Sequence, residues 1–321
     1  MKKLLSLALV FAAACGGGAL KDQIRDAMPG ASETQIGSPK ASAQASRAPN
    51  APELSSTVGQ SSQWFDTTAG VAATFNIGTV WVLGLVEAIV SNEPTSCSQA
   101  ANSCTWGPGS SPLDANSFKL VVTKNGEVFH YELSGEPKSK PGSGFIVFLS
   151  GDGTPGAQRH HGSGTFKVDF EAAQQLDRPS GDHGVLNVAY TNVGPAHIDA
   201  TFLGAKDDKD ATQRDNIAYT YANNTTGGGE LSFAVHKPWN NDERFSIHSR
   251  WKNDGQGRAD VHAQGMSGTS PYDAHLNECW GAAPFNVVYF ASDFSIVFGS
   301  NSGVETSCAY SPEAYSSLTV Q

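Results

Sequence analysis

From Phe118 onward, apolar and polar residues alternate with a period of two, and glycine, proline and asparagine interrupt the pattern at short intervals. Such alternation is typical of strands with one buried face, and tight turns between short strands indicate an antiparallel meander. A sheet of about a dozen strands has to curl, close or split in two. The predicted strands after the first hairpin cover residues 145–150, 164–170, 185–191, 196–204, 215–223, 230–236, 244–252, 257–264, 272–279, 285–292 and 304–310.

The clearest hairpin is predicted over residues 118–133. Asn125-Gly126 is the preferred residue pair for a two-residue type I′ turn, and such a turn places Val122 opposite Phe129. One face of this hairpin is then apolar throughout, so turn chemistry and residue pattern agree.

A helix is predicted before the strands, because apolar residues between Phe65 and Val90 recur at spacings of three to five. Gly78 and Gly84 each cost about 1 kcal/mol against alanine in a helix interior. A strand over residues 79–86 therefore remains an alternative, and the helix is predicted for residues 78–91.

These elements together predict a mainly β (α+β) fold. We expect a strongly curved antiparallel meander or an open barrel packed on one N-terminal helix, with a β-sandwich as the alternative. Residues 59–321 are long enough for one sizeable core and are expected to form a single β-rich globular domain.

The N-terminus has the pattern of an export signal. Two lysines precede an apolar run from Leu4 to Ala14, which has about half of the roughly 20 residues that a transmembrane helix needs. Residues 1–14 are thus predicted to be a signal peptide, and the chain is expected to be exported and not integral to the membrane. An ordinary secretory signal, with Cys15 incidental, is the alternative to lipidation.

Residues Ala12-Ala13-Ala14-Cys15 resemble the lipobox of bacterial lipoproteins. The resemblance implies that Cys15 becomes the first mature residue and carries a diacylglycerol and an amide-linked acyl chain of the palmitate type. Two or more chains hold a protein firmly in a leaflet, because each buried methylene contributes about 0.8 kcal/mol. Gly16 stands where aspartate would favour the inner membrane, so an outer-membrane location, on the periplasmic or surface face, is expected by analogy.

Residues 15–58 are rich in Ala, Ser, Gly, Pro and Gln and poor in aromatic residues. Such a segment buries too little apolar surface to offset its ordering entropy. It is predicted to be a disordered tether behind the lipidated cysteine, with at most marginal helical turns near Leu20 to Ile24.

Charge argues against a nucleic-acid partner. Removing Lys2 and Lys3 with the signal peptide leaves 19 basic against 31 acidic residues, a net charge of −12. An acidic surface disfavours nucleic acid and adhesion to anionic lipid, so the predicted membrane contact is the N-terminal lipid alone.

With Cys15 lipidated, four cysteines remain, an even number typical of disulfides in an exported chain. Three connectivities are open, and proximity in sequence favours Cys97–Cys104 with Cys279–Cys308. Neither spacing is CxxC, which argues against a zinc or thioredoxin-like redox site.

A candidate polar binding face lies on the two strands around the turn at Asp254-Gly255. A loop of odd length, three residues for example, would place five polar residues on one face: His248, Arg250, Arg258, Asp260 and His262. Arginine could bind an anion there, and a His–Asp pair could act in acid–base catalysis. The alternative is a solvated outer face with cross-strand ion pairs worth under about 1 kcal/mol each.

Other polar clusters lack the spacing of a known site. The histidine pairs have neither HxH nor HExxH spacing, the acidic loop lacks the EF-hand pattern, and the glycine-rich run is followed by a strand. No catalytic residue, metal ligand or cofactor is therefore predicted. The segments concerned are His160-His161, Asp182-His183, Asp207 to Asp210 with Asp215, Ser163 and Gly227 to Gly229.

Three segments resemble recurring motifs of uncharacterised lipoproteins from predatory and soil deltaproteobacteria of the myxobacterial type: Pro94 to Pro108, Ser249 to Val261, and Asn277 to Trp280. The resemblance covers about residues 60–310 and implies an exported, tethered β domain. We therefore expect a lipid-anchored cell-envelope protein with a non-catalytic binding or structural domain, for a protein or small-molecule partner that the sequence does not identify. An envelope hydrolase using a His/Asp pair and a carrier of hydrophobic ligands are the alternatives.

Overall fold

The computed structural model describes residues 18–28, 30, 34–39, 56–158, 161–207, 209–224, 227–265, 271–293 and 301–320, without the side chains of residues 19, 80–82 and 158. The predicted signal peptide and Cys15 lie outside these residues. The chain forms two compact units, the first comprising residues 1–34 and 80–193 and the second residues 35–79 and 194–321.

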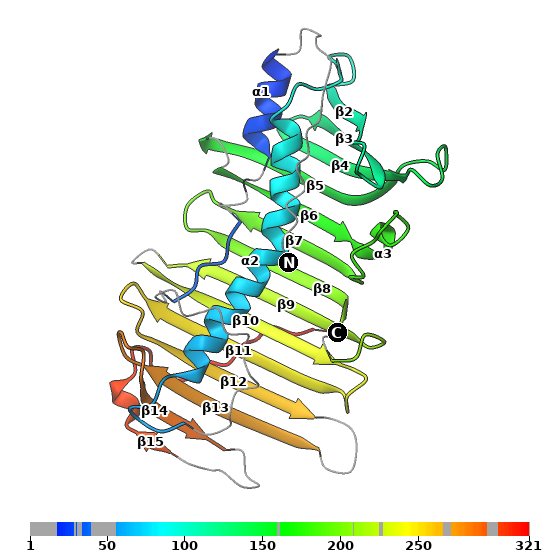
Figure 1. Cartoon of the computed structure of the whole chain (residues 1–321). Coiled ribbons are helices and arrows are strands. Elements are labelled where there is room, and N and C mark those ends of the chain that lie inside the picture. Colours follow the sequence, from blue (N-terminus) through cyan, green and yellow to red (C-terminus); the bar gives the residue numbers. More distant parts are fainter. Residues whose placement is uncertain are drawn as a thin grey trace. The chain divides into compact units, whose positions relative to one another are not determined.

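The first unit contains α1 (Gly18–Ala27), the last part of α2 (Gln63–Val90) and seven strands (Figure 1). The strands pair antiparallel in chain order, from β1 to β7. They are β1 (Ser96–Ser98), β2 (Ser103–Gly109), β3 (Asn116–Asn125), β4 (Val128–Pro137), β5 (Ile146–Gln158), β6 (His161–Asp169) and β7 (Val185–Thr191), with the short helix α3 (Phe170–Ala173) between the last two.

The second unit contains the first part of α2 and eight strands, again antiparallel and in chain order. They are β8 (His197–Lys206), β9 (Arg214–Asn223), β10 (Gly228–Lys237), β11 (Glu243–Lys252), β12 (Gly257–Gly265), β13 (Tyr272–Trp280), β14 (Val287–Ser292) and β15 (Ser302–Gly303), followed by the 3₁₀ turn η1 (Glu305–Ser307). The prediction of a mainly β fold with an antiparallel meander and an N-terminal helix is confirmed. Among the described residues, the first strand of each unit does not pair with the last strand of that unit, so neither meander closes, and the strands of each unit lie in one open sheet instead of a β-sandwich.

The helix begins fifteen residues earlier than the predicted 78–91. Ser62 caps its N-terminus by accepting a hydrogen bond from the backbone N–H of Phe65 at 3.0 Å. The carboxylate of Glu278 on β13 accepts the N–H of Trp64 at 3.1 Å and both hydroxyls of Ser56 and Ser62. The apolar spacing already reached back to Phe65, but Gly78 and Gly84 argued against a continuous helix. The second half of the cap comes from a strand more than two hundred residues away.

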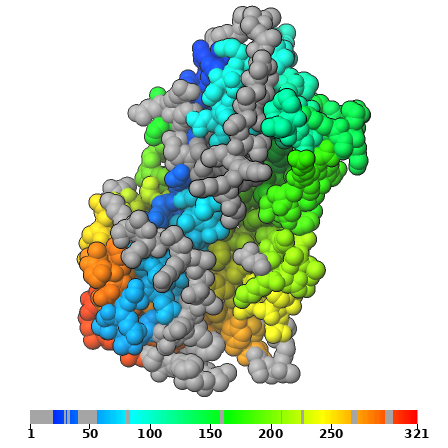
Figure 2. All heavy atoms as spheres, in the orientation of Figure 1, coloured from blue at the N-terminus to red at the C-terminus, as the bar shows by residue number. Residues whose placement is uncertain are grey.

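In the second unit, α2 packs on one face of the sheet. Trp64 and Phe65 are buried in a cluster with Ile247, Val261 and Leu276, together with Ala259, Trp280, Val287 and Phe290. The segment before the helix is bound to the sheet edge, since Ser61 forms a bridge with Asn286. Figure 2 shows this segment and the first turns of α2 in blue at the surface, beside the orange strands.

Within the described residues, α2 is a helix long and apolar enough, by length and composition only, to cross a membrane. In the structure, 47% of its most apolar 18-residue window is buried. The buried residues of the second unit include Trp64 and Phe75, and those of the first unit include Leu83 and Val86. The same apolar stripe that suits a membrane span thus serves as the helical side of both cores.

Part of the predicted tether is folded. In α1, Ile24 is fully buried, and Met28, which follows it, is 1% exposed. Arg25 donates from Nε to the carbonyl of Val90 and from Nη2 to that of Ser91, each at 2.7 Å. A cation on the last carbonyls of a helix stabilises its C-terminus. The expectation of disorder therefore fails for this stretch, because a few apolar residues and one arginine find partners in the rest of the first unit.

The hairpin of β3 and β4 differs from its predicted register by two residues. Val122 lies opposite Tyr131 instead of Phe129, and Gly126 and Glu127 form the two-residue turn. Gly126 has a φ of +63°, which suits the first central position of a type II′ turn. A shift of two leaves every side chain on its predicted face, so the apolar pattern could not detect the error.

The ends of the sheet were predicted least well. β1 and β2 had not been expected as strands, and residues 304–310 do not form one. Both disulfides, Cys97–Cys104 and Cys279–Cys308, are confirmed. The second one explains the failed strand, since it draws the chain after β15 away from the sheet edge and back to β13.

Candidate functional site

The polar face predicted around Asp254 forms on β11 and β12. The register places His248 directly opposite Asp260, and Arg250 opposite Arg258. Side chains of opposed residues share a side of the sheet, so four of the five predicted residues do come together.

The turn that sets this register has the predicted odd length. Lys252 donates its backbone N–H to the carbonyl of Gln256 at 2.9 Å, which encloses three residues. The last of them, Gly255, has a φ of +87°, as a three-residue hairpin loop with a left-handed glycine requires.

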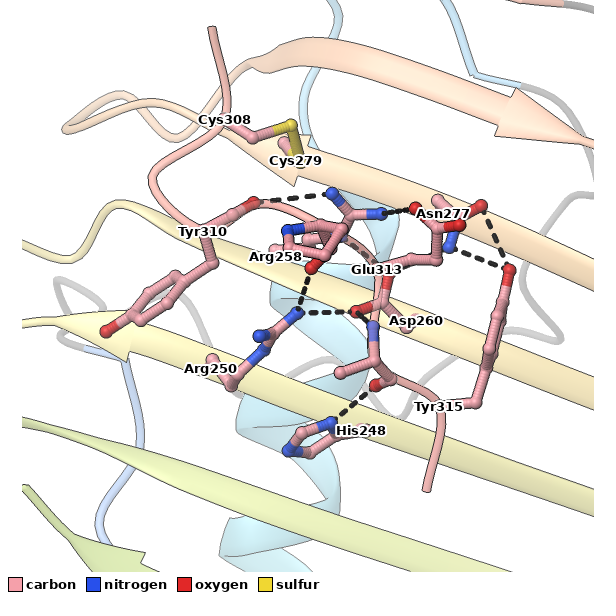
Figure 3. Close-up of polar contacts among 12 residues, drawn as sticks. His248, Arg250, Arg258, Asp260, Asn277, Cys279, Cys308, Tyr310, Glu313 and Tyr315 are labelled. Carbon is pink, nitrogen blue, oxygen red and sulfur yellow. Dashed lines mark hydrogen bonds and ion pairs between the residues drawn. A yellow bond between two sulfur atoms is a disulfide. The ribbon is translucent and has the colours of Figure 1, made fainter. Parts of the chain in front are cut away.

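This polar face is covered by the chain's own C-terminal strap, which we define as residues 308–320 (Figure 3). Arg258 is 1% exposed and Asp260 is fully buried. The alternative of a solvated outer face is therefore wrong. Charges removed from water need close partners, and the strap supplies several of them.

Asp260 is the centre of the covered network. Its carboxylate accepts hydrogen bonds from Arg258 Nε at 2.6 Å and Arg250 Nη2 at 2.8 Å. Asn277 Nδ2, from β13, donates at 2.7 Å, and the backbone N–H of Ala314, from the strap, donates at 3.0 Å. Four donors satisfy the two oxygens, so this carboxylate is a structural acceptor.

Arg258 links the sheet to the strap and to the turn before it. Its Nη1 donates to Glu305 at 2.6 Å and to the carbonyl of Tyr310 at 3.3 Å, and Nη2 lies 3.7 Å from the carboxylate of Glu313. Burial by itself lowers the pKa of Arg258, but the hydrogen bonds that Arg258 donates to Glu305 and Asp260 outweigh it and raise that pKa. The guanidinium is thus held charged by the protein's own groups.

His248 is held between two acceptors. Nε2 faces the carboxylate of Glu230 at 2.6 Å, and Nδ1 faces the carbonyl of Ala314 in the strap at 2.5 Å. Both ring nitrogens therefore suit donation to acceptors. The predicted anion site is filled from within the chain, and its residues anchor the strap.

His262, the fifth predicted residue, belongs to a different cluster. Its Nε2 lies 2.6 Å from Asp273 Oδ1, and its ring stacks on that of His275 with centroids 4.4 Å apart. His262, Asp273 and His275 each offer one ligand atom, and these atoms lie within 4.8 Å of one another. Asp293 contacts the other side of the pair, with Oδ2 3.0 Å from His275 Nδ1. Among the described residues, this is the group that could hold a metal ion.

A pocket of about 280 Å³ lies on the same face, between the ends of β10, β11 and β12 and the last residues of the strap. Its lining includes Arg244, His236, Ser246, His262 and Thr319. His236 is 7% exposed, and its Nδ1 has no hydrogen-bond partner among the residues that the structure describes. Its Nε2 contacts the carboxylate of Asp242. The pocket presents a guanidinium, two imidazoles and several hydroxyl groups, beside the apolar side chains of Phe245, Leu318 and Val320.

The acidic loop proves to be ion-paired with a lysine. Asp207 and Asp215 both contact the ammonium group of Lys237, at 2.5 and 3.1 Å. The hydrogen bond from Lys237 holds the pKa of Asp207 well below its usual range. Asp207 also accepts the backbone N–H groups of Lys209 and Asp210, and its side chain is buried instead of solvated.

Other sequence candidates have ordinary partners or lie outside the described residues. His183 pairs with Glu171 at 3.1 Å across the loop after α3. Ser163 lies on β6 opposite Thr191 of β7. His160 and Asp208 fall outside the described residues.

The sequence did not single out His236, Arg244, Asp273 or His275. The signal that could have found them is the register itself, because Ala234, Ser246, His262 and His275 form one row across four strands. His236, Arg244, Gln264 and Asp273 form the next row on the same face. Extending the period-two pattern of β12 to its neighbours would have required knowing every turn length.

Comparison of the chain with protein-family models, with curated proteins and with solved structures found no significant match.

Proposed function

We propose that the chain is an exported protein of the cell envelope, anchored by lipid on Cys15, in which the β units have a non-catalytic binding or structural role. The two disulfides support an oxidising compartment, where such bonds form and persist. The N-terminal signal pattern and the lipobox resemblance support export and anchoring, with the outer membrane as the proposed location.

The contacts of the polar face favour binding over hydrolysis. A general base has to reach a substrate proton, yet the nitrogens of His248 and the oxygens of Asp260 face protein donors and acceptors. His262 pairs with Asp273 instead of Asp260. The residues that the hydrolase alternative would use therefore have structural partners.

The pocket beside the strap carries the binding proposal, and its chemistry indicates a small anionic ligand. Arg244 and His236 lie directly opposite each other on β10 and β11 and line it together. A guanidinium binds carboxylate or phosphate with two parallel hydrogen bonds. His236 Nδ1, which is buried and has no hydrogen-bond partner among the described residues, supplies a second polar group for such a ligand. Arg244 and His236 favour an anion over the uncharged hydrophobic ligands of the carrier alternative, and Phe245, Leu318 and Val320 add apolar contacts in the same lining.

The anchor is tested by Cys15→Ser in a Gram-negative host. The wild type should sediment with the membrane fraction, and the variant should appear in the soluble fraction. Cys97→Ser is the matched control, because it removes another cysteine and should leave the protein in the membrane. Unchanged membrane retention of the Cys15 variant would overturn the anchor.

The pocket is tested by titrating the purified full chain with inorganic phosphate and with succinate, followed by calorimetry or NMR. Saturable binding of either probe should be lost in Arg244→Gln and retained in Arg214→Gln, which alters an arginine on β9 outside the pocket. Binding that neither variant changes, or no saturable binding by the wild type, would contradict an anion site here.

A further inference from the structure

The cluster of His262, Asp273 and His275 has a geometry that the network around Asp260 does not explain. His262 on β12 and His275 on β13 are directly opposed, and Asp273 precedes His275 by two residues, so all three point to one face of the sheet. Their side chains are between 27% and 62% exposed. An ion from solution can therefore reach them.

Two imidazoles and a carboxylate are the donor set of a divalent transition metal. Zinc sites with an open position commonly use three such ligands, whereas calcium and magnesium prefer oxygen alone. Zn²⁺ bound at 2.0–2.1 Å by nitrogen holds neighbouring ligands about 3.4 Å apart. Because the ligand atoms here already lie within 4.8 Å, side-chain rotation without backbone movement would bring them to that spacing.

Asp293 places a carboxylate beside the second ring nitrogen of His275. Such a partner distinguishes a histidine that binds a metal from an ordinary surface histidine. Asp293 Oδ2 lies 3.0 Å from Nδ1 of His275, and its backbone is also bound to this residue, with its N–H donating to the carbonyl of His275 at 3.1 Å. A carboxylate that accepts a hydrogen bond from one ring N–H fixes the tautomer, so the other nitrogen carries the free lone pair and becomes more basic.

The rings are also held in place by the strap. The ring of Tyr315 packs edge-on against His275 with centroids 4.7 Å apart, and its hydroxyl bonds with Asn277 at 3.0 to 3.2 Å. The structure thus supplies both ligands and the groups that orient them.

We propose that His262, Asp273 and His275 form a binding site for one divalent transition-metal ion, for which Zn²⁺ is the best fit, with Asp293 orienting His275. The ion takes the place of the hydrogen bond between His262 Nε2 and Asp273 Oδ1. The remaining coordination position is filled by water. This proposal does not rest on the anion pocket, although His262 also lines that pocket.

The experiment is a calorimetric titration of the full chain with Zn²⁺, with Co²⁺ absorption as a report on coordination. The wild type should bind one ion saturably. His275→Ala and Asp273→Asn should weaken binding at least about tenfold, and Asp293→Asn should weaken it about 10- to 100-fold, as loss of an orienting carboxylate does.

Two control variants test whether the loss of Zn²⁺ affinity is specific to this site and independent of the anion pocket. His197→Ala removes a histidine of the same unit that also pairs with an aspartate, Asp199, at 2.9 Å. It should leave the affinity unchanged, and so should Arg244→Gln, which alters the anion pocket only. If His197→Ala lowers the affinity as much as His275→Ala does, the ion binds elsewhere and the proposal fails.

A measurement on the wild type covers the case in which a variant does not fold. Resonances of the His262 and His275 rings should shift on addition of Zn²⁺ at a one-to-one ratio, ahead of those of the other histidines. Shifts spread over all the histidines, or no saturable binding of Zn²⁺, would overturn the site.

Discussion

The sheet of the second unit is covered on both sides, but by opposite means. On the helix face, Trp64 and Phe65 of α2 meet an apolar surface that includes Ile247 and Val261. On the other face, the C-terminal strap meets the charged network of Arg258 and Asp260. Apolar burial is non-directional and tolerates small changes, whereas a buried ionic network requires every partner in place. Single substitutions should therefore weaken the packing of the strap on the sheet far more than they weaken the packing of the helix.

The largest expected effect is that of Asp260→Ala. The change leaves Arg250 and Arg258 without their shared carboxylate, and breaking a buried pair in this way costs about 3–5 kcal/mol. Urea unfolding measures the loss, and hydrogen exchange at the N–H of Ala314 reports the release of the strap. Asp199→Ala, which removes an exposed carboxylate of the same unit, should cost under about 1 kcal/mol. A loss below 1 kcal/mol for both variants would show that the network is not structural.

Removing the disulfide that fixes the start of the strap should have a similar but slightly smaller effect. Cys279 and Cys308 are 29 residues apart, and a loop of that length is worth about 3.5 kcal/mol in the chain-entropy model. The double variant Cys279→Ser/Cys308→Ser should lower the free energy of unfolding by about this amount. Exchange of the strap amides should increase more than that of the β11 amides, and equal increases would mean that the strap is not separately anchored.

On the helix face, Ile247→Ala should cost about 2–4 kcal/mol, the usual range for a buried isoleucine or leucine truncated to alanine. This residue lies on β11 next to His248, so the two faces are compared on one strand. Unlike Asp260→Ala, the variant should leave the exchange of the Ala314 N–H unchanged relative to global unfolding. Selective release of the strap by Ile247→Ala would contradict the independence of the two faces.

The smallest expected effect is a difference between the two faces in how the free energy of unfolding depends on pH. On the helix face, burial raises the pKa of Glu278, and the hydroxyls of Ser56 and Ser62 only partly oppose this. Because the folded state binds this proton more tightly than the unfolded state does, its contribution is fully present below the unfolded pKa of about 4.5 and is lost as pH rises through the folded value. Glu278→Gln should remove that slope.

On the strap side, the hydrogen bond from His236 lowers the pKa of Asp242, and that from His262 lowers the pKa of Asp273. These contributions have the opposite sign, since they are present above about pH 4 and are lost as pH falls through the folded values. Urea unfolding of Glu278→Gln and Asp242→Asn between pH 3 and pH 7 checks both signs. The same slope in both variants would be inconsistent with this assignment.

The sequence predicted the parts of the fold that depend on local pattern. Strands β8 to β14 of the second unit, the odd turn length near Asp254 and both disulfides were predicted from alternation, turn chemistry and proximity in the chain. The register of the 118–133 hairpin was wrong by two residues, because Gly126 can serve in either of two turns and neither changes the faces. The failed strand at 304–310 has a different cause, since Cys308 is bound to β13 and cannot continue along the edge.

The sequence also predicted part of the candidate site, because that part depends on local pattern as well. Period two placed His248, Arg250, Arg258 and Asp260 on one face, as the structure confirms. Nothing in these strands indicated that the last thirteen described residues of the chain would cover that face. His275 and Asp293 were missed because the role of each depends on its contact with a residue from another part of the chain. The residue pattern within one strand does not show such a contact.

By itself, the sequence determined which residues alternate, which turns can form and which cysteines are available, since these depend on neighbours within a few residues. Only the tertiary structure decided what lies on each face of the sheet. A polar row is equally compatible with water, with a ligand or with the chain's own backbone, because all three satisfy the same hydrogen-bonding groups. The strap took that role here, and it left the two clusters nearest its end, at Arg244 and at His275, as the places where binding is proposed.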